Sequence, residues 1–361
     1  MRISIVGGGN IGTLLGAEFA FQGHEVTMYT SKPERWSHQL QVFALNDELL
    51  IESTVANITA DIAKAVVDQD YIFVTLPSHV QLEFAKKAAP YVKKGTKFVI
   101  VPGYGGSEFL MNPLIAKGAS LIGFQRVHAI ARLVKYGHSV CMRGRKPSIR
   151  LAVLNYAGEV SALQTDMEGL FALPVEVLPN YLAVTLTPSN PILHTSRLYT
   201  MFKEYKPGMV YPHNIPFYDS WTDDSSKALM AMDDEEQMLC KSLPGIDLKD
   251  VHSLRHHYES PTVVAMTHKL SHIDSFHGIM SPMIEIENGW IPDFNSRYFS
   301  CDFEFGLEFL CQFTDMARVE APVMHRVMNW YREVTGNRHP KVSISDYGIL
   351  TKEDIYTYYK N

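Results

Sequence analysis

Cysteine is scarce in this sequence, and long apolar runs are absent. The cysteines lie far apart or at spacings that fit neither a zinc knuckle nor a disulfide scaffold. They are Cys141, Cys240, Cys301 and Cys311. No stretch has the length and apolarity of a membrane span, and no apolar segment of a signal peptide precedes the first predicted strand. We therefore expect a cytoplasmic protein with reduced thiols and no membrane partner.

Positive charge is also in short supply. The 33 lysines and arginines are outnumbered by 39 aspartates and glutamates, which gives a formal net charge of -6. Proteins that bind nucleic acid usually carry a basic face, so we expect no nucleic-acid partner. The hydrophobic share of 46% and the charged share of 20% are typical of a globular protein, and 361 residues predict two domains.

A glycine-rich turn lies between an apolar strand and a helix near the N-terminus. The stretch "ISIVGGGNIGTLLGAEFAFQGHEVTMY" predicts a strand at residues 3–6, a helix at 13–22 and a second strand at 25–29. In the G-x-G-x-x-G spacing the first glycine permits the tight turn, the second lets a pyrophosphate approach, and the third lets helix and strand pack closely. The helix N-terminus favours the anion. The predicted cofactor-binding residues of this turn are Gly7, Gly9, Asn10, Ile11 and Gly12.

The residues after the second strand favour NADP(H) over NAD(H). An NAD site usually has Asp or Glu about 20 residues after the glycines, where it binds the ribose 2'-hydroxyl. Here "MYTSKPER" has Thr30 and Ser31 at that place, followed by Lys32 and Arg35. Hydroxyl groups and cations suit a 2'-phosphate, which a carboxylate would repel. The alternative is that Lys32 and Arg35 are solvated surface charges.

Strands and helices continue to alternate after this site. "DYIFVTLPSH" predicts a strand that ends at Leu76 and Pro77, which we expect to line the cofactor crevice. Ser78 is the expected cap of the next helix, and "KFVIVPGYGG" predicts another strand with a glycine turn. From Arg126 onward, short strands joined by glycine-containing turns are expected to extend or flank the sheet.

The second half is mostly helical in pattern. "DDSSKALMAMDDEEQMLCKSL" predicts a helix with acidic residues on its solvent side, and "PTVVAMTHKLSHIDSFHG" places His268 and His272 four residues apart on one helix face. His252, His256 and His257 are further candidate ligands, but no carboxylate motif accompanies them. We therefore predict no metal site and expect the histidine faces to line a polar pocket.

These patterns together predict an α/β fold. We expect a Rossmann-type doubly wound sheet in an NAD(P)-binding domain over residues 1–185, followed by a mostly α-helical second domain over residues 186–361.

A histidine at the start of a helix raises the question of catalysis. In "SNPILHTSRLY", Pro191 fits the first helical turn and Asn190 can cap it, which places His194 on that first turn. Taken alone, such a histidine is more often structural than catalytic.

A second segment offers partners for that histidine. "NSRYFSCDFEFGLEFL" contains Arg297 and Asp302, in a stretch that we expect to be a loop up to Glu304. In isolation these two are an ordinary surface ion pair or two solvated charges. Functionally, a carboxylate can fix an imidazole tautomer, and a guanidinium can bind a substrate carboxylate in a bidentate way.

The chain resembles the octopine/nopaline (opine) dehydrogenase family over nearly its whole length. "IVGGGNIG" and the stretch from "DYIFVTLPSH" to "PGYGG" are similar to the nucleotide domain of that family, and "AIARLVKYGHSVCMRGRK" to its strand meander. "TLTPSNPILHTSRLY" resembles the Asn-Pro-x-x-His signature, and "SRYFSCDFEFGL" the Arg-Tyr-x-x-x-Asp-x-x-x-Gly segment. The last two match in content and in order, which makes them specific together.

The resemblance implies an enzyme that condenses the amine of an amino acid with a 2-oxo acid and reduces the imine with NAD(P)H. It implies that His194 is the acid/base residue, that Asp302 is its carboxylate partner, and that Arg297 anchors a substrate carboxylate. Asn190 and Tyr104 are further candidate substrate-binding residues. An imidazole positioned in this way can move the protons that imine formation requires.

Two departures from the family pattern concern the substrate. Pro188 stands where the family often has a second Asn, and the run Cys301-Asp302-Phe303-Glu304 replaces a typical Glu-Asp-Val-Pro. Neither the amino acid nor the oxo acid follows from the sequence, and monomer and homodimer both stay open.

Two alternatives belong to other functional classes. A 2-oxo acid reductase of the ketopantoate-reductase kind has the same two-domain plan and uses no amine. That class commonly relies on a lysine of the helical domain, and no lysine here lies in a comparable motif. A non-catalytic NADP(H) sensor is the third possibility, and the full set of candidate catalytic residues argues against it.

Overall fold

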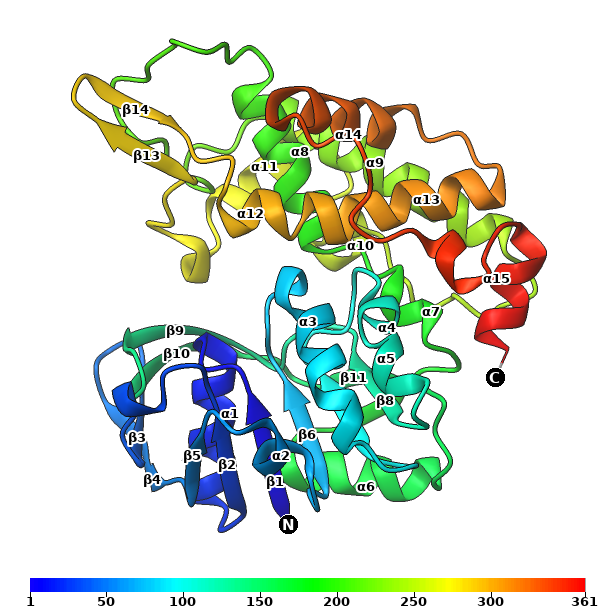
Figure 1. The fold of residues 1–361 in the computed structure, drawn as a ribbon. Helices are drawn as coiled ribbons and strands as arrows, with labels where there is room; N and C mark the ends of the chain where they lie inside the picture. The colour runs from blue at the N-terminus through cyan, green and yellow to red at the C-terminus, as the bar shows by residue number, and fades with distance from the viewer. Residues whose placement is uncertain (361) are drawn as a thin grey trace. The chain divides into compact units, whose positions relative to one another are not determined.

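Residues 1–360, which the structure (a computed structural model) describes, form two units, Met1–Thr185 and Leu186–Lys360 (Figure 1). The first contains the large sheet and the second is mainly helical. The predicted combination of a Rossmann-type sheet and a helical second part is thus confirmed. Among the helices of residues 1–360, none combines the length and the apolar character of a membrane-spanning segment.

Unit 1 is built on an eight-stranded sheet in the order β12-β11-β8-β7-β6-β1-β2-β5. Its strands are β1 (Arg2–Val6), β2 (Glu25–Tyr29), β5 (Asn57–Thr59), β6 (Tyr71–Val74), β7 (Lys97–Ile100), β8 (Ser120–Phe124), β11 (Ile149–Leu154) and β12 (Val175–Val177). Neighbouring strands are parallel except for the β8–β11 pair. The strand order reverses between β1 and β6, and ligands of such sheets bind beyond the carboxyl ends of the strands at this reversal.

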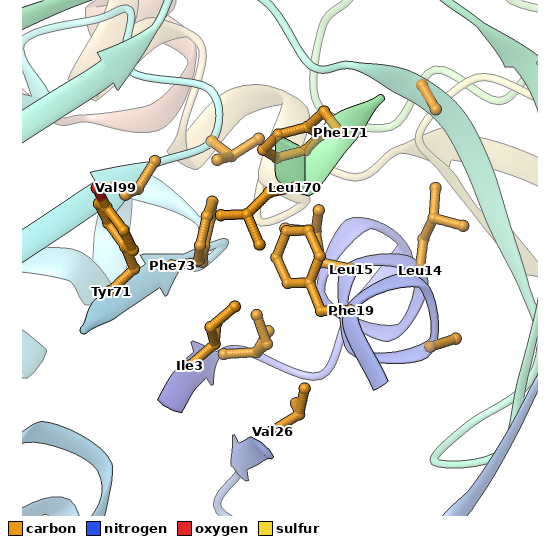
Figure 2. Close-up of a cluster of buried hydrophobic side chains, with 14 of the residues drawn as sticks. Ile3, Leu14, Leu15, Phe19, Val26, Tyr71, Phe73, Val99, Leu170 and Phe171 are labelled. Atoms are coloured by element: carbon orange, nitrogen blue, oxygen red, sulfur yellow. The ribbon is translucent and has the colours of Figure 1, made fainter. Parts of the chain in front are cut away.

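The central strands are apolar because both of their faces are covered. All four residues of β6 are buried, as are four of the five in β1. Helix α1 (Asn10–Phe21) brings Phe19 against Phe73 of β6 and Phe171 of α6 (Val160–Phe171), with ring centroids 5.0 and 5.4 Å from that of Phe19 (Figure 2). This aromatic cluster fixes α1 on the sheet and thereby the turn that precedes the helix.

A second sheet of unit 1 has the order β4-β3-β10-β9. Its strands are β3 (Gln39–Phe43), β4 (Leu49–Thr54), β9 (Ala129–Lys135) and β10 (Ser139–Arg145). The predicted meander is therefore divided, since β9 and β10 join this second sheet while β11 joins the first. Helix α1 contacts strands of both sheets, so most of its surface is buried.

The remaining helices of unit 1 are short, apart from one. They are α2 (Ile62–Val66), α3 (Ser78–Ala88), α4 (Ser107–Leu110), α5 (Asn112–Ile115) and α7 (Leu182–Thr185). The predicted capping role of Ser78 is wrong. Pro77 occupies the cap position with extended backbone, so Ser78 is the first helical residue and makes no capping bond.

Unit 2 is a set of helices with one β-hairpin. The helices are α8 (Asn190–Phe202), α9 (Asp223–Ser242), α10 (Leu254–His257), α11 (Val263–Ser271), α12 (Arg297–Ser300), α13 (Glu308–Ala317), α14 (Pro322–Thr335) and α15 (Lys352–Tyr359). The hairpin pairs β13 (Met283–Ile286) with β14 (Gly289–Pro292). A π-helical turn, Phe303–Leu307, leads into α13.

The sequence predicts that the acidic residues of α9 lie on its solvent side, and this prediction is wrong for some of them. Asp233 and Glu235 are buried because they bind backbone N–H groups at the starts of other helices. Both carboxylate oxygens of Asp233 lie 2.9 Å from the amide nitrogen of Leu254 in α10, and Glu235 accepts N–H bonds of 2.7 and 2.8 Å from Val323 and Met324 in α14. Desolvation raises the pKa of Asp233 to about 6. These two acids fasten α10 and α14 to the central helix of the unit.

Candidate functional site

The glycine turn has the backbone geometry that a bound pyrophosphate requires. Gly7 has a φ of 111°, and a Cβ placed on Gly12 would lie 1.8 Å from the carbonyl oxygen of Gly7, so only glycine fits at position 12. A Cβ on Gly9, the N-cap residue of α1, would meet no atom within 4 Å. The backbone at Gly9 therefore faces open space at a helix N-terminus, where an anion is favoured.

Two predicted cofactor residues of this turn have side chains that serve the fold. The Asn10 side-chain oxygen accepts a 2.9 Å hydrogen bond from the backbone N–H of Leu133 in β9. Ile11 packs against the hydrophobic core of unit 1.

The end of β6 supports the glycine turn. Thr75 donates its hydroxyl to the carbonyl oxygens of Val6 and Gly7, at 3.2 and 3.1 Å. Leu76 lies so close to Gly7 that a Cβ there would be 3.2 Å from its Cδ2 atom, whereas Pro77 is exposed. The structure thus brings Leu76 to the predicted crevice and adds Thr75, whose role the strand pattern does not reveal.

The four residues predicted to select the cofactor differ in exposure. Thr30 is only 5% exposed, and its hydroxyl binds the Tyr136 hydroxyl at 3.2 Å and accepts the Lys32 backbone N–H at 3.3 Å. Ser31, Lys32 and Arg35 are exposed, and the Arg35 guanidinium lies 5.1 Å from the centroid of the Tyr136 ring. The Thr30 hydroxyl therefore makes hydrogen bonds within the protein. The hydroxyl of Ser31 and the cations of Lys32 and Arg35 are the groups exposed to solvent.

In unit 2, helix α8 begins one residue earlier than expected. Ser189 is its N-cap and Asn190 its first residue, so the predicted capping role of Asn190 is wrong. Pro191 is the second residue, a position where proline has no hydrogen bond to lose. His194 is the fifth residue and belongs to the second turn. Its side chain points to partners from two later segments.

His194 and Asp302 form a hydrogen-bonded pair. His194 Nδ1 lies 2.8 Å from Asp302 Oδ2, and the two side chains are 10% and 14% exposed. Because a carboxylate only accepts, Nδ1 carries a proton, and the neutral ring has its lone pair on Nε2. Nε2 lies 3.0 Å from the Tyr218 hydroxyl. An imidazole held in one tautomer by a carboxylate is suited to proton transfer through its other nitrogen.

The position of Asp302 depends on the π-helical turn that follows it. Helix α12 (Arg297–Ser300) precedes this turn, with Cys301 and Asp302 between the two, so the predicted loop up to Glu304 is wrong for most of the stretch. A Cβ on Gly306 would lie 2.8 Å from Pro191 Cγ, so the absent side chain lets the turn approach α8 closely. This close approach brings Asp302 within reach of His194.

Aromatic side chains surround the imidazole. The Tyr298 ring lies 4.6 Å from the His194 ring, and Phe217 presents an edge at 5.4 Å. Arg297 is exposed, with its guanidinium 5.9 Å from the Tyr298 ring centroid. Arg297 thus neighbours Tyr298, whose ring packs against His194, while Asp302 pairs with the histidine.

A buried arginine on α8 holds the segment 217–221. Arg197 donates to the backbone oxygens of Phe217 (3.0 Å) and Ser220 (2.7 Å), and to the hydroxyls of Ser220 (2.8 Å) and Ser225 (3.1 Å). These partners are neutral, and desolvation lowers the pKa of Arg197 to about 10. Sequence analysis predicts neither Arg197 nor Tyr218 as a site residue. The spacing offers a signal for Arg197, which lies three residues, or about one helical turn, after His194.

The histidines at the C-terminal end of α11 form a separate pair. His268 and His272 stack with ring centroids 4.2 Å apart and both are exposed, and the expectation that they line a polar pocket stays a prediction. No group of three or more His, Cys, Asp or Glu side chains in residues 1–360 is arranged to hold a metal ion. Tyr104 belongs to unit 1, where it is half-buried after β7.

Two family models match separate parts of the chain. One is described as NAD/NADP octopine/nopaline dehydrogenase, alpha-helical domain, and matches residues 177–335. The other is described as NAD-dependent glycerol-3-phosphate dehydrogenase N-terminus and matches residues 2–142.

Individual proteins are similar over nearly the full length. Octopine dehydrogenase of Mizuhopecten yessoensis is 24% identical, over 99% of this chain and 94% of the relative. The structure of octopine dehydrogenase with NADH and L-arginine has a TM-score of 0.84 at 21% identity, covering 99% and 98% of the two chains. Yersinopine dehydrogenase with NADP+ bound has a TM-score of 0.67 at 15% identity, covering 93% and 91%.

Proposed function

The chain belongs to the octopine/nopaline (opine) dehydrogenase family, and we propose that its His194–Asp302 pair drives the NAD(P)H-dependent reductive condensation of an amino acid with a 2-oxo acid. The observation that carries the proposal is this pair, whose Nδ1 is fixed by a carboxylate at 2.8 Å. Condensation requires a group that first removes a proton from the amine and later donates one to a leaving hydroxyl. A histidine with a fixed tautomer can do both.

The proton-transfer steps follow from this arrangement. His194 accepts a proton from the substrate ammonium, and the free amine attacks the keto carbon to give a carbinolamine. The imidazolium, stabilised by Asp302, returns the proton to the carbinolamine hydroxyl, which leaves as water while the nitrogen lone pair forms the iminium. NAD(P)H supplies the hydride that reduces this carbon. The product is a secondary amine that weighs one oxygen atom less than the two substrates together, and mass spectrometry of the product tests the proposed function.

The residues of unit 1 fit a dinucleotide. Gly9 offers open space at the N-terminus of α1, and Gly12 keeps that helix close to the turn. We propose that Gly7, Gly9 and Gly12 hold the pyrophosphate through backbone contacts, together with the N–H groups of Asn10 and Ile11. Leu76 and Pro77 would line the same crevice after β6.

We further propose that NADP(H) is preferred to NAD(H). The support is the exposed pair Lys32 and Arg35 after β2, together with Thr30 and Ser31 at the end of that strand, where an NAD site usually has its carboxylate. Within this fold, NADH accompanies octopine dehydrogenase and NADP+ accompanies yersinopine dehydrogenase, so both cofactors occur on it.

Lys32→Ala and Arg35→Ala should each raise the KM for NADPH by about 10-fold or more, because each removes a charged contact to the 2'-phosphate. The KM for NADH should stay within about 2-fold of its original value. Lys117→Ala is the matched control, since Lys117 is exposed just before β8, at the amino-terminal edge of the sheet. Steady-state kinetics with both cofactors checks this, and equal use of NADPH and NADH by the unaltered protein would contradict the preference.

Arg297 is proposed to anchor a substrate carboxylate, with Asn190 and Tyr104 as further substrate ligands. Its guanidinium is exposed beside Tyr298, whose ring packs against His194. Arg297→Lys should raise the KM for the oxo acid by about 10-fold, because lysine retains the charge but loses the planar fork. The KM for NADPH should not change.

Arg326→Lys is the matched control for Arg297→Lys, since Arg326 is an exposed arginine on α14. An unaltered oxo-acid KM in Arg297→Lys would mean that another cation binds the substrate.

A cytoplasmic location and a monomeric or homodimeric state stay predictions.

A further inference from the structure

Tyr218 is hydrogen-bonded to His194 Nε2, the nitrogen through which the proposed reaction must exchange protons. Its hydroxyl lies 3.0 Å from His194 Nε2, and the residue is only 5% exposed. Because Asp302 fixes the proton on Nδ1, the neutral Nε2 is an acceptor and the phenol donates to it. The side chains therefore form a continuous chain of hydrogen bonds, Asp302–His194–Tyr218.

The Tyr218 ring is fixed from several sides. The Phe276 ring stacks on it at 4.3 Å, the Trp221 ring lies parallel at 6.0 Å, and Phe217 makes an edge contact at 4.9 Å. The backbone on both sides of Tyr218 is held as well, since Arg197 binds the carbonyl oxygens of Phe217 and Ser220. Moving the phenol away from Nε2 would break this packing.

We propose that Tyr218 is a catalytic residue that passes protons between His194 and the substrate. The inference rests on the proposed function and adds to it the group that contacts the reacting nitrogen and oxygen atoms. Direct contact of Nε2 with the substrate would require the fixed phenol to leave, whereas a relay uses the hydroxyl where it lies.

Protons and charge balance in both proton-transfer steps of the relay. Tyr218 gives its hydroxyl proton to Nε2 while it accepts one from the substrate ammonium, so the phenol stays neutral and the imidazole becomes an imidazolium. After the C–N bond has formed, the imidazolium returns a proton to the phenol while the phenol protonates the carbinolamine hydroxyl. The C–O bond then breaks, water leaves, and the nitrogen lone pair forms the iminium. The carbon receives hydride from NAD(P)H, and the product amine takes one proton from solvent.

Tyr218→Phe removes the relay oxygen and retains the ring. We expect kcat to fall by about 10- to 100-fold, while the KM values for both substrates and the Kd for NADPH stay within about 3-fold. For the parent protein, a plot of kcat against the fraction of D2O in the solvent should be curved, because two protons move in the same step. For Tyr218→Phe the same plot should be linear. Tyr199→Phe is the matched control, since Tyr199 also lies on unit 2, where its ring packs against Trp330; its kcat should stay within about 2-fold of the parent.

A second variant separates a relay from a loss of structure. Replacing Tyr218 by 3-fluorotyrosine retains the ring and the hydroxyl but makes the phenol more acidic, so kcat and its pH profile should both shift. A Tyr218→Phe protein with kcat within about 2-fold of the parent, or a fluorotyrosine protein with an unchanged pH profile, would overturn the relay. If the parent protein condenses no amino acid with any oxo acid, the proposed function itself fails; if the parent is active and Tyr218→Phe is equally active, only the relay fails.

Discussion

His194→Gln should lower kcat by about 100- to 10,000-fold, because glutamine can hydrogen-bond but cannot accept and return a proton at neutral pH. The Kd for NADPH should stay unchanged, since the glycine turn belongs to unit 1. Steady-state kinetics with saturating substrates measures the first quantity, and fluorescence titration with NADPH the second. A fall in kcat at constant cofactor affinity is the signature of a group that acts in the chemical steps.

His268→Gln is the matched control, because His268 is a histidine of the same unit that is exposed on α11. It should leave kcat and the thermal midpoint near those of the parent. A His194→Gln protein that folds, binds NADPH and retains near-normal kcat would return His194 to a structural role.

Asp302→Asn is expected to have the second-largest effect, a fall in kcat of about 100- to 10,000-fold. The amide cannot stabilise the imidazolium, and its NH2 group can donate to Nδ1, which would place the ring proton on Nε2. The N–H at Nε2 and the O–H of Tyr218 would then be two donors facing each other at 3.0 Å. Kinetics of both single variants and of the double variant give the coupling between the two residues.

The double variant should be little worse than His194→Gln alone, because the two side chains act as a unit. Asp315→Asn is the matched control, since Asp315 forms another Asp–His pair of unit 2 with His325, at 3.2 Å on a more exposed surface. That variant should leave kcat within about 2-fold of the parent. Losses that add fully in the double variant would show that His194 and Asp302 do separate jobs.

The glycine turn is predictable from sequence because its signal is local. Gly7, Gly9 and Gly12 fall within one turn between a strand and a helix. Gly7 has a positive φ, and Gly12 lies against the carbonyl oxygen of Gly7, so these two demands for glycine arise within the turn itself. The fold class follows for the same reason, since the apolar runs of β1 and β6 are continuous. Thr75 is the exception, because its hydroxyl serves the turn from a different strand.

The proposed catalytic pair is less accessible to sequence analysis. His194 and Asp302 are 108 residues apart, and only the family resemblance connects them. Tyr218 cannot be predicted in the same way, because its place depends on the buried Arg197 and on stacking with Phe276. Asp233 and Glu235 look like solvent-facing acids for a similar reason, since the helix starts that they bind come from distant segments.

The most direct test of the central claim compares NADPH oxidation in the presence of pyruvate alone with oxidation in the presence of pyruvate and each common amino acid. We expect oxidation only when both substrates are present, with at least one amino acid giving a secondary amine whose mass is that of the two substrates less one oxygen atom. Oxidation that is equally fast with pyruvate alone would show a simple 2-oxo acid reductase. Tight NADPH binding with no turnover across a full panel of 2-oxo acids and amino acids would show a sensor, and either result would contradict the account.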